Sequence, residues 1–295
     1  MADYGIDECF TDIDDALKRN PDMAIIAGPS NVHISMGMLL ARQGVHLLIE
    51  KPLSADLNHV DELIRLCNSK HTCLMVGYNM RFNPALIYFV HAVQEGIIGR
   101  VLSVHAEVGQ HLMGWRKQQD YRASVSARKS LGGGVLLELS HEIDYLNWIF
   151  DKPSHVNGVV LHQSELEIDV EDSVHAFIEW HDETGRMING ILSMDFYRHD
   201  PTRFCHIVGT EGSLRWDGIS GTVEWFDSRK SKWETLANHA DGMAESYRYE
   251  LEHFVSCVQL GRSPQISGED GKRVLQVVEA LRRSGALAAK VAVSD

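Results

Sequence analysis

Three short apolar segments stand out in the first eighty residues of the chain. They occupy residues 23–27, 45–49 and 73–76, and each is too short to form a helix. Nearly continuous apolar runs of this length are typical of strands that are buried on both faces of a parallel sheet. We therefore expect three parallel strands in this region.

The segments between these strands have helical patterns. Residues 31–42 can form a helix that is capped by Asn31 and stopped by Gly44, because asparagine caps helix N-termini and glycine favours the conformation that ends a helix. Ser54 is the expected cap of a second helix, whose apolar positions have near-helical spacing: Leu57, Val60, Leu63, Ile64 and Leu66. Strands and helices that alternate with short links are the pattern of parallel βαβ units.

The remainder of the chain has a different order of elements. Helices are expected at residues 84–95, 135–150, 243–260 and 268–284, and strands at 101–109, 155–163, 170–180, 185–197, 202–209, 212–216 and 222–226. Direct hairpins between such strands imply a largely antiparallel sheet. The predicted fold class is α/β plus α+β. An incomplete Rossmann-type parallel sheet domain (residues 1–83) precedes an α+β domain with a large, mainly antiparallel open sheet (residues 84–295). We expect the final helix, 268–284, to pack back on the first domain.

Composition narrows the classes of function. A chain of 295 residues with a net charge of −13 lacks the electrostatic footprint of proteins that bind nucleic acid or anionic membranes. No apolar run approaches the roughly 18 residues of a membrane span, and the amino terminus has no signal-peptide pattern. The five cysteines are scattered without a Cys-x-x-Cys motif. This favours reduced thiols in a cytoplasmic protein and argues against a zinc site.

The second apolar strand ends at two charged residues, Glu50 and Lys51, followed by Pro52. Ligands bind at the carboxyl ends of the strands in open α/β sheets. A lysine held there beside an apolar wall can have a lowered pKa and transfer protons. A solvated Glu–Lys pair at the end of a strand is an equally good interpretation of this stretch alone.

A long polar segment covers residues 111–131. Its aromatic and cationic members are Trp115, Arg116, Lys117, Tyr121, Arg122, Arg128 and Lys129. Loops of this length inside a compact chain are usually functional or disordered. Interleaved rings and cations suit a polyol or an anionic ligand, and a solvated loop is the alternative interpretation.

Three consecutive glycines, at 132–134, precede the expected helix 135–150. At about 100° per residue its apolar side chains form one stripe. Four polar or aromatic side chains share the opposite face: Glu138, His141, Tyr145 and Trp148. A carboxylate one turn from a histidine can fix its tautomer and raise its basicity. A structural role is the other interpretation of this histidine.

One feature of dinucleotide-binding domains is absent from the sequence. Such domains open with a strand, a Gly-x-Gly-x-x-Gly motif at a helix start and an acidic residue about 20 residues on. No such motif occurs in this chain. The chain begins where roughly 30 residues of that unit should have passed. Either the fold differs, or the chain is shortened at its amino terminus.

Four motifs, in this order, resemble those of the Gfo/Idh/MocA oxidoreductases. They are Pro29-Ser30-Asn31-x-His33, Glu50-Lys51-Pro52, Gly77-Tyr78-Asn79-Met80-Arg81-Phe82, and the glycine-rich entry to His141-Glu142-Ile143-Asp144. The resemblance covers essentially the whole chain. It implies NAD(P)-linked oxidation or reduction of a sugar, polyol or related hydroxy compound. It also implies a Rossmann domain followed by an α+β domain whose open sheet forms a homo-oligomer interface.

The resemblance also implies roles for individual residues. Lys51 matches the active-site lysine and His141 the general base; Glu138 replaces an aspartate that usually stands four residues before that histidine, here three. The cofactor, NAD or NADP, is expected to contact Pro29, Asn31, His33, Glu50, Lys51 and Asn79. The substrate is expected to contact Trp115, Tyr121, Arg122, Lys129, Asp144 and Tyr145. No metal is expected, and the Lys51–Pro52 bond is expected to be cis, as it often is in the family.

Two classes of function remain open. The first is an NAD(P)-dependent dehydrogenase or reductase acting on CH–OH groups, in which His141 takes the alcohol proton while Lys51 hydrogen-bonds the same oxygen. The second is a non-catalytic or truncated family member that binds a sugar or a partner. Lys51 and His141 favour the first class, whereas the absent glycine-rich motif favours the second.

Overall fold

The computed structural model describes residues 5–115 and 118–294. Its first part is a parallel three-stranded sheet in the order β1-β2-β3. The strands are β1 (Met23–Ile26), β2 (His46–Glu50) and β3 (Leu74–Gly77), and the helices beside them are α1 (Ile13–Leu17), α2 (His33–Arg42) and α3 (Val60–Lys70). The middle strand is buried on both faces, since Leu47, Leu48 and Ile49 are at most 4% exposed. The predicted parallel strands are therefore confirmed.

The two predicted helix caps are wrong. Asn31 lies in a 3-10 turn (Ser30–Val32), and its side-chain amide donates to the carbonyl oxygen of Ser130 at 2.9 Å instead of capping α2. Helix α3 begins at Val60, six residues after Ser54, whose hydroxyl accepts from a backbone amide in its own turn. Asn31 is thus held by a contact with a distant segment, and Ser54 by a local turn, so neither side chain caps a helix.

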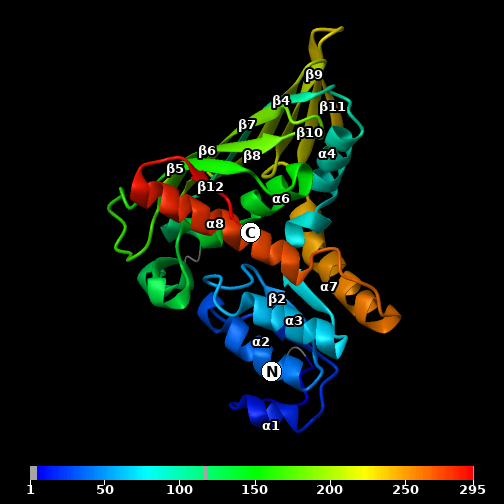
Figure 1. Cartoon of the computed structure of the whole chain (residues 1–295), viewed down its shortest axis with the longest axis vertical. Coiled ribbons are helices and arrows are strands. Elements are labelled where there is room, and N and C mark those ends of the chain that lie inside the picture. Colours follow the sequence, from blue (N-terminus) through cyan, green and yellow to red (C-terminus); the bar gives the residue numbers. More distant parts are fainter. Residues whose placement is uncertain (1–4, 116–117, 295) are drawn as a thin grey trace.

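The second sheet has nine strands in the order β11-β10-β9-β8-β4-β7-β6-β5-β12. Its strands are β4 (Val101–Gly109), β5 (His155–Leu161), β6 (Ser173–His181), β7 (Met187–Asp195), β8 (Thr202–Gly209), β9 (Gly212–Asp217), β10 (Thr222–Asp227), β11 (Lys232–Asn238) and β12 (Val291–Ala292). Of its neighbouring pairs only β4 and β7 run parallel. The predicted mainly antiparallel sheet is confirmed (Figure 1).

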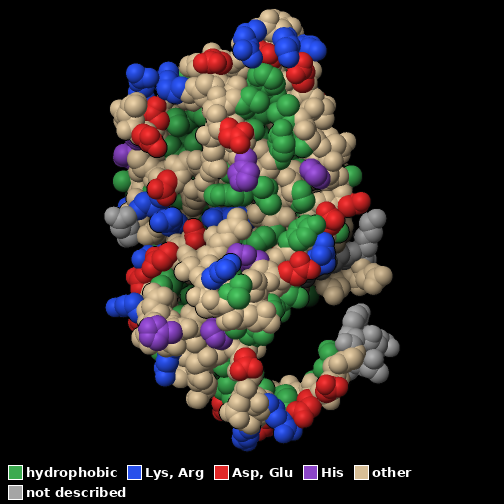
Figure 2. Space-filling view, turned by 90° about the vertical axis from the view of Figure 1, so that its right-hand side faces the viewer, with side chains coloured by type: hydrophobic (Ala, Val, Ile, Leu, Met, Phe, Trp, Pro, Cys, Tyr) green, Lys and Arg blue, Asp and Glu red, His purple; other side chains and the backbone are tan. Residues whose placement is uncertain are grey.

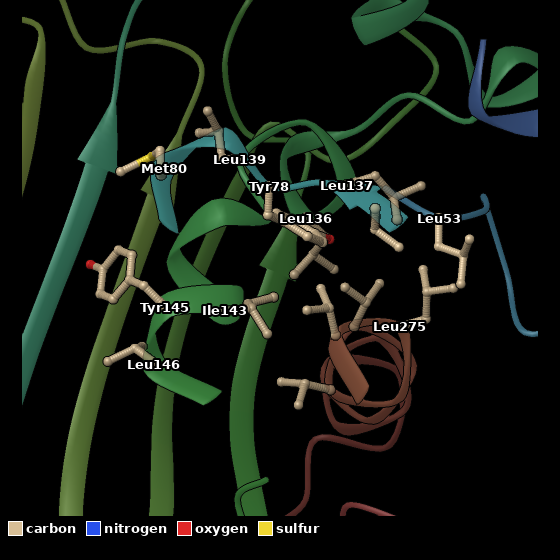
Figure 3. Packing of buried hydrophobic residues seen from close by; sticks show 14 of the residues in the cluster. Leu53, Tyr78, Met80, Leu136, Leu137, Leu139, Ile143, Tyr145, Leu146 and Leu275 are labelled. Carbon is tan, nitrogen blue, oxygen red and sulfur yellow. The ribbon is translucent and has the colours of Figure 1, made fainter. Parts of the chain in front are cut away.

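Helices cover one face of this large sheet. They are α4 (Pro84–Gln94), α5 (Val135–Glu138), α6 (His141–Phe150) and α8 (Gly268–Leu287), whereas α7 (Gly242–Leu260) packs mainly against the turn Asn79–Phe82 that follows β3. Figure 3 shows Tyr145 and Leu146 on one side of α6 and Ile143 on the side toward α8. Helix α8 also touches the first sheet, because a Cβ on Gly271 would lie 2.9 Å from side-chain atoms of Leu53 and Val76. Through α8, the helical layer on the large sheet therefore also contacts the first sheet.

The other face of the large sheet is open. Alternation along β6 buries Val174 and Trp180 and leaves Phe177 64% exposed. Further apolar side chains are exposed on β5 and β7, among them Val159 and Ile191. This face therefore exposes apolar side chains among polar ones such as His175 and Asn189, and no layer covers it in the described part of the chain.

The first sheet also has an open edge. Strand β1 pairs with β2 on one side only among the described residues, and Ile25 of β1 is 54% exposed. Figure 2 shows the surface hollowed between the lower end of the molecule, where α1 lies, and the main body. Within the described residues, no helix is both long enough and apolar enough to cross a membrane.

Candidate active site

Lys51 directly follows β2, at the carboxyl end of the first sheet. The bond between Lys51 and Pro52 is cis, as the resemblance implied. The Lys51 ammonium donates a hydrogen bond to the backbone carbonyl oxygen of Glu138 at 2.6 Å. Lys51 therefore links the end of the first sheet to the helices that cover the second sheet.

The helix predicted over residues 135–150 is broken in two. Helix α5 is one turn, Val135–Glu138, and α6 begins at His141, because Leu139 leaves helical geometry at φ −101° and ψ 21°. The break removes the predicted common face of Glu138, His141, Tyr145 and Trp148, since two helices with separate axes no longer share one face. His141 is instead the first residue of a new helix, close to the Lys51–Glu138 contact.

Glu138 does not pair with His141 in this structure. The Glu138 carboxylate accepts a hydrogen bond from the Ser126 hydroxyl at 2.8 Å. His141 Nδ1 is buried and has no hydrogen-bond partner in the described part of the chain. The predicted carboxylate–imidazole pair is therefore wrong, and the backbone break after Glu138 is the reason.

His141 lies in a cationic environment. Its pKa is well below the ordinary value of 6.5, first because of burial and then because of the positive charges of Lys51 and Arg203. The Tyr78 ring packs edge-on against its imidazole, with centroids 5.6 Å apart. His141 is therefore neutral at pH 7, as a proton acceptor must be, and Lys51 and His141 are brought to one place.

An ion pair beside His141 was not predicted from the sequence. Glu142 is fully buried, and Arg203 Nε donates to its Oε1 at 2.8 Å. Arg203 comes from β8, where it shares the helix-covered face with Cys205 and Ile207, both 0% exposed. The sequence signal that could have identified Arg203 is its position in the strand, because it alternates in step with the apolar residues Cys205 and Ile207.

The residues expected at the cofactor occupy two environments. Pro29 is half-buried and Asn31 is exposed on the loop after β1, and Glu50 is half-buried as the last residue of β2, directly before the loop that starts at Lys51. His33 is buried, and its two ring nitrogens face the carbonyl oxygens of Gly28 and Pro52, each at 2.9 Å. His33 therefore braces these two loops from inside.

Asn79 lies on the loop after β3 and is also buried. Its amide donates to the Ser246 hydroxyl of α7 at 2.8 Å. Glu250, one turn further along α7, is 4% exposed and its Oε1 has no described partner. Burial and the charge of Glu50 raise the pKa of Glu250 to about 8. An unpartnered buried oxygen at this end of the sheet fits a site for a polar group such as a nicotinamide cofactor.

The loop residues expected at the substrate mostly have partners of their own. Trp115 donates to the Gln110 carbonyl at 3.1 Å, and the Tyr121 hydroxyl accepts from the Glu167 amide at 3.2 Å. Arg122 is exposed and bound to Asp120. Lys129 lines a separate cavity of about 660 Å³ with Arg282. Arg116 and Lys117 lie outside the described residues.

Two predicted substrate residues are interior residues. Tyr145 is 0% exposed and packs edge-on against Trp216, with ring centroids 5.6 Å apart. Asp144 is 0% exposed and accepts two hydrogen bonds from Arg81, at 2.9 and 2.7 Å. Substrate contact is corrected for both, because the start of α6 at His141 turns them toward the core. No cluster of three or more metal-ligating side chains occurs in the described ranges.

A short parallel sheet with a lysine at a strand end, facing a helix-covered antiparallel sheet with a neutral histidine, defines a two-part oxidoreductase fold. Two family models match the chain: "Oxidoreductase family, NAD-binding Rossmann fold" over residues 1–78, and "Oxidoreductase family, C-terminal alpha/beta domain" over residues 90–293. The chain belongs to the Gfo/Idh/MocA oxidoreductase family, and the predicted resemblance is confirmed.

Relatives in this family have several activities. Myo-inositol 2-dehydrogenase of Thermotoga maritima is 24% identical over 289 residues, which cover 95% of this chain and 82% of that protein. A 2,7-anhydro-N-acetylneuraminate hydratase of Mediterraneibacter gnavus is 26% identical over 212 residues, which cover 70% of this chain and only 54% of the relative. A solved levoglucosan dehydrogenase in complex with NADH has a TM-score of 0.87 at 22% identity, and the match covers 100% of this chain and 86% of that one.

Proposed function

We propose that this chain transfers a hydride between a nicotinamide cofactor and a hydroxyl or keto group of a sugar, polyol or sugar derivative. The observation that supports this best is the approach of Lys51 to the backbone beside His141, with the imidazole held neutral by burial and two cations. A neutral base and a cation at one carbon–oxygen bond are the groups that alcohol oxidation needs.

In the proposed mechanism, His141 accepts the proton of the reacting hydroxyl. Lys51 donates a hydrogen bond to the same oxygen and stabilises the negative charge that develops on it. The Glu138 carbonyl orients the Lys51 ammonium, so Glu138 acts through its backbone. When bound, the cofactor supplies the hydride acceptor. In the reverse direction His141 returns the proton to the carbonyl oxygen.

The cofactor would lie across the carboxyl ends of the first sheet. Pro29 and Asn31 are accessible on the loop after β1, and Glu50 at the end of β2. His33 and Asn79 fix the loops from behind through the contacts to Gly28, Pro52 and Ser246. We therefore assign Pro29, Asn31 and Glu50 to direct contact and the other two to positioning.

A sugar-binding module without hydride transfer is the second candidate. It is the alternative that the sequence left open, and it would keep the Lys51–Glu138 contact as part of a binding site. Such a module would bind its sugar at the same residues, Lys51 and His141. It differs from the enzyme in one measurable property, which is that it does not bind nicotinamide cofactors.

Three further features belong to the proposal. The chain divides near residue 83 into a cofactor domain and a substrate domain, and α8 connects them. The open apolar face around Phe177 forms a homo-oligomer interface, because exposed apolar patches of this kind mark interaction sites. Five unpaired cysteines support a reducing, cytoplasmic location.

Nicotinamide fluorescence distinguishes the two candidates. The full chain is titrated separately with NADH and NADPH, and the Lys51→Met variant is titrated alongside. Saturable binding by both proteins supports the enzyme, since Lys51 is assigned to the reacting oxygen. The absence of saturable binding of either cofactor to the wild-type chain would refute the dehydrogenase and leave the module.

A further inference from the structure

We propose that Arg203 binds a negatively charged group of the substrate, so that the site takes a sugar acid or a sugar phosphate in preference to a neutral sugar. The inference rests on the proposed function, because it places a sugar between Lys51 and His141. It adds the chemical class of the sugar and the residue that selects it.

The first observation is the position of Arg203. Its side chain leaves β8 on the face that α6 covers, and it reaches Glu142, the residue next to His141. Its stem passes closely over Gly218, where a Cβ would lie 2.7 Å from Arg203 Cγ. The backbone at Gly218 thus leaves room for the stem, and the side chain is 16% exposed. The guanidinium is therefore held in place and still reaches the surface of the site.

The second observation is the unused edge of the guanidinium. Arg203 Nε donates to Glu142 Oε1 at 2.8 Å, and Nη2 lies 3.5 Å from Oε2. An arginine has five N–H donors in a fixed fork. No hydrogen bond joins Arg203 Nη1 to any residue in the described ranges. One edge of the fork therefore remains for a carboxylate or phosphate, the groups that arginine recognises with two parallel bonds.

The third observation is the charge around the reacting groups. The chain has a net charge of −13, yet the charges that lower the pKa of His141 are two cations, Lys51 and Arg203. Glu142, a buried carboxylate on which both cations act, already pairs with Arg203. The sequence drew attention to Arg122 and Lys129 as cations for an anionic ligand, but Arg122 is neutralised by Asp120. Arg203 is the arginine that lies beside the proposed reacting groups.

A purely structural role for Arg203 makes a different prediction. If the arginine only neutralises buried Glu142, its loss lowers the stability of the protein, and neutral and acidic sugars bind equally well before and after the substitution. Binding selectivity between sugars of equal ring structure is therefore the property that separates the two roles. It can be measured without any cofactor.

The experiment measures the binding of glucose, glucuronate and glucose 6-phosphate to the full chain by calorimetry or ligand-observed NMR. The wild-type chain should bind at least one of the two anions about tenfold or more tightly than glucose, as expected for a charge-assisted hydrogen bond in a partly buried site. Glucuronate and glucose 6-phosphate distinguish a carboxylate from a phosphate as the recognised group. The Arg203→Met variant should lose this selectivity, and Arg203→Lys should retain part of it.

Arg215→Met is the matched control. Arg215 is also an arginine of the large sheet with Nε bound to a glutamate, Glu224, but it lies beside Trp233 on the open face. Its substitution should leave the selectivity unchanged. Because Arg203→Met leaves the Glu142 charge buried, the double variant Arg203→Met/Glu142→Gln restores a neutral interior and should also lack selectivity.

Three results would overturn the proposal. They are equal affinity of the wild-type chain for all three sugars, selectivity that survives in both Arg203→Met variants, and no binding of any sugar. The nicotinamide titration is independent of these outcomes. Cofactor binding without anion selectivity would refute the role of Arg203 alone, whereas anion selectivity without cofactor binding would refute hydride transfer alone.

Discussion

The buried ion pair between Arg81 and Asp144 allows a quantitative test of whether Asp144 has a structural role or binds the substrate. Asp144 belongs to one of the four family motifs and was expected to contact substrate. In the structure the Asp144 side chain is 1% exposed and the Arg81 side chain 6%, and two hydrogen bonds at 2.7 and 2.9 Å join them. The pair connects the loop after β3 to α6.

Replacing Asp144 with alanine leaves the Arg81 guanidinium buried without its main partner. Removal of one member of a buried pair typically costs about 3–5 kcal/mol of unfolding free energy. Asp270 lies 3.7 Å from Arg81 Nη2 and is 22% exposed, so it can compensate in part. We therefore expect a loss near the lower bound, about 3 kcal/mol.

The assay is equilibrium urea unfolding of the wild-type chain, Asp144→Ala and Asp120→Asn. Asp120 pairs with Arg122 on the surface, where both side chains are nearly half exposed, and its loss should cost under about 1 kcal/mol. The sugar affinity of folded Asp144→Ala should equal that of the wild-type chain. Wild-type stability together with weakened sugar binding would refute the structural role and restore Asp144 to the substrate site.

Three other outcomes are expected. Arg203→Met should raise the pKa of His141 toward 6.5, since one of the two cations that lower it is gone. In a plot of kcat against pH, the acid limb should then move to higher pH. An acid limb at the wild-type position would contradict the effect of Arg203 on His141. Glu250, with a pKa of about 8 against an ordinary 4.5, holds a proton in the folded chain that the unfolded chain loses. As the pH rises from about 4.5 to about 8, the unfolding free energy of the wild-type chain should therefore fall, by up to about 1.4 kcal/mol per pH unit. Urea titrations at several pH values measure the slope of unfolding free energy against pH, which Glu250→Gln should flatten. An equal slope in the variant would contradict the raised pKa of Glu250. Phe177→Glu should convert the proposed oligomer to a monomer in analytical ultracentrifugation, and sedimentation like the wild-type chain would exclude this face as the interface.

Local patterns predicted the elements that depend on local forces. The strand at residues 45–49 was recognisable because a nearly continuous apolar run, interrupted only by His46, suits a strand buried on both faces, and β2 is found at His46–Glu50. The helix that starts at Pro84 was predicted from proline at the first helical position, and α4 starts there with Asn83 as its cap. In both cases the residues that determine the element lie within it or directly beside it in the sequence.

Other features depend on partners far away in the chain. The break between α5 and α6 places Lys51 against the Glu138 carbonyl, 87 residues along the chain, and no periodicity in residues 135–150 contains that contact. Arg203 was overlooked because its partner Glu142 lies 61 residues earlier, on another element. Lys51 was singled out by its place at the end of an apolar strand and His141 by its place on a predicted helix, and the family motifs gave both their roles. The orientation of their neighbours required the tertiary structure.

Sugar-dependent reduction of NAD(P)⁺, followed by nicotinamide absorbance, tests the central claim most directly. The wild-type chain, Lys51→Met, His141→Asn and the surface control Lys70→Met, whose lysine is exposed on α3, are compared over one panel of neutral and acidic sugars. The account predicts turnover by the wild-type chain and by Lys70→Met. It also predicts a loss of about a hundredfold or more in the two site variants, since each lacks a group that acts in the transition state. Turnover that persists at the wild-type rate in Lys51→Met or His141→Asn would contradict the account.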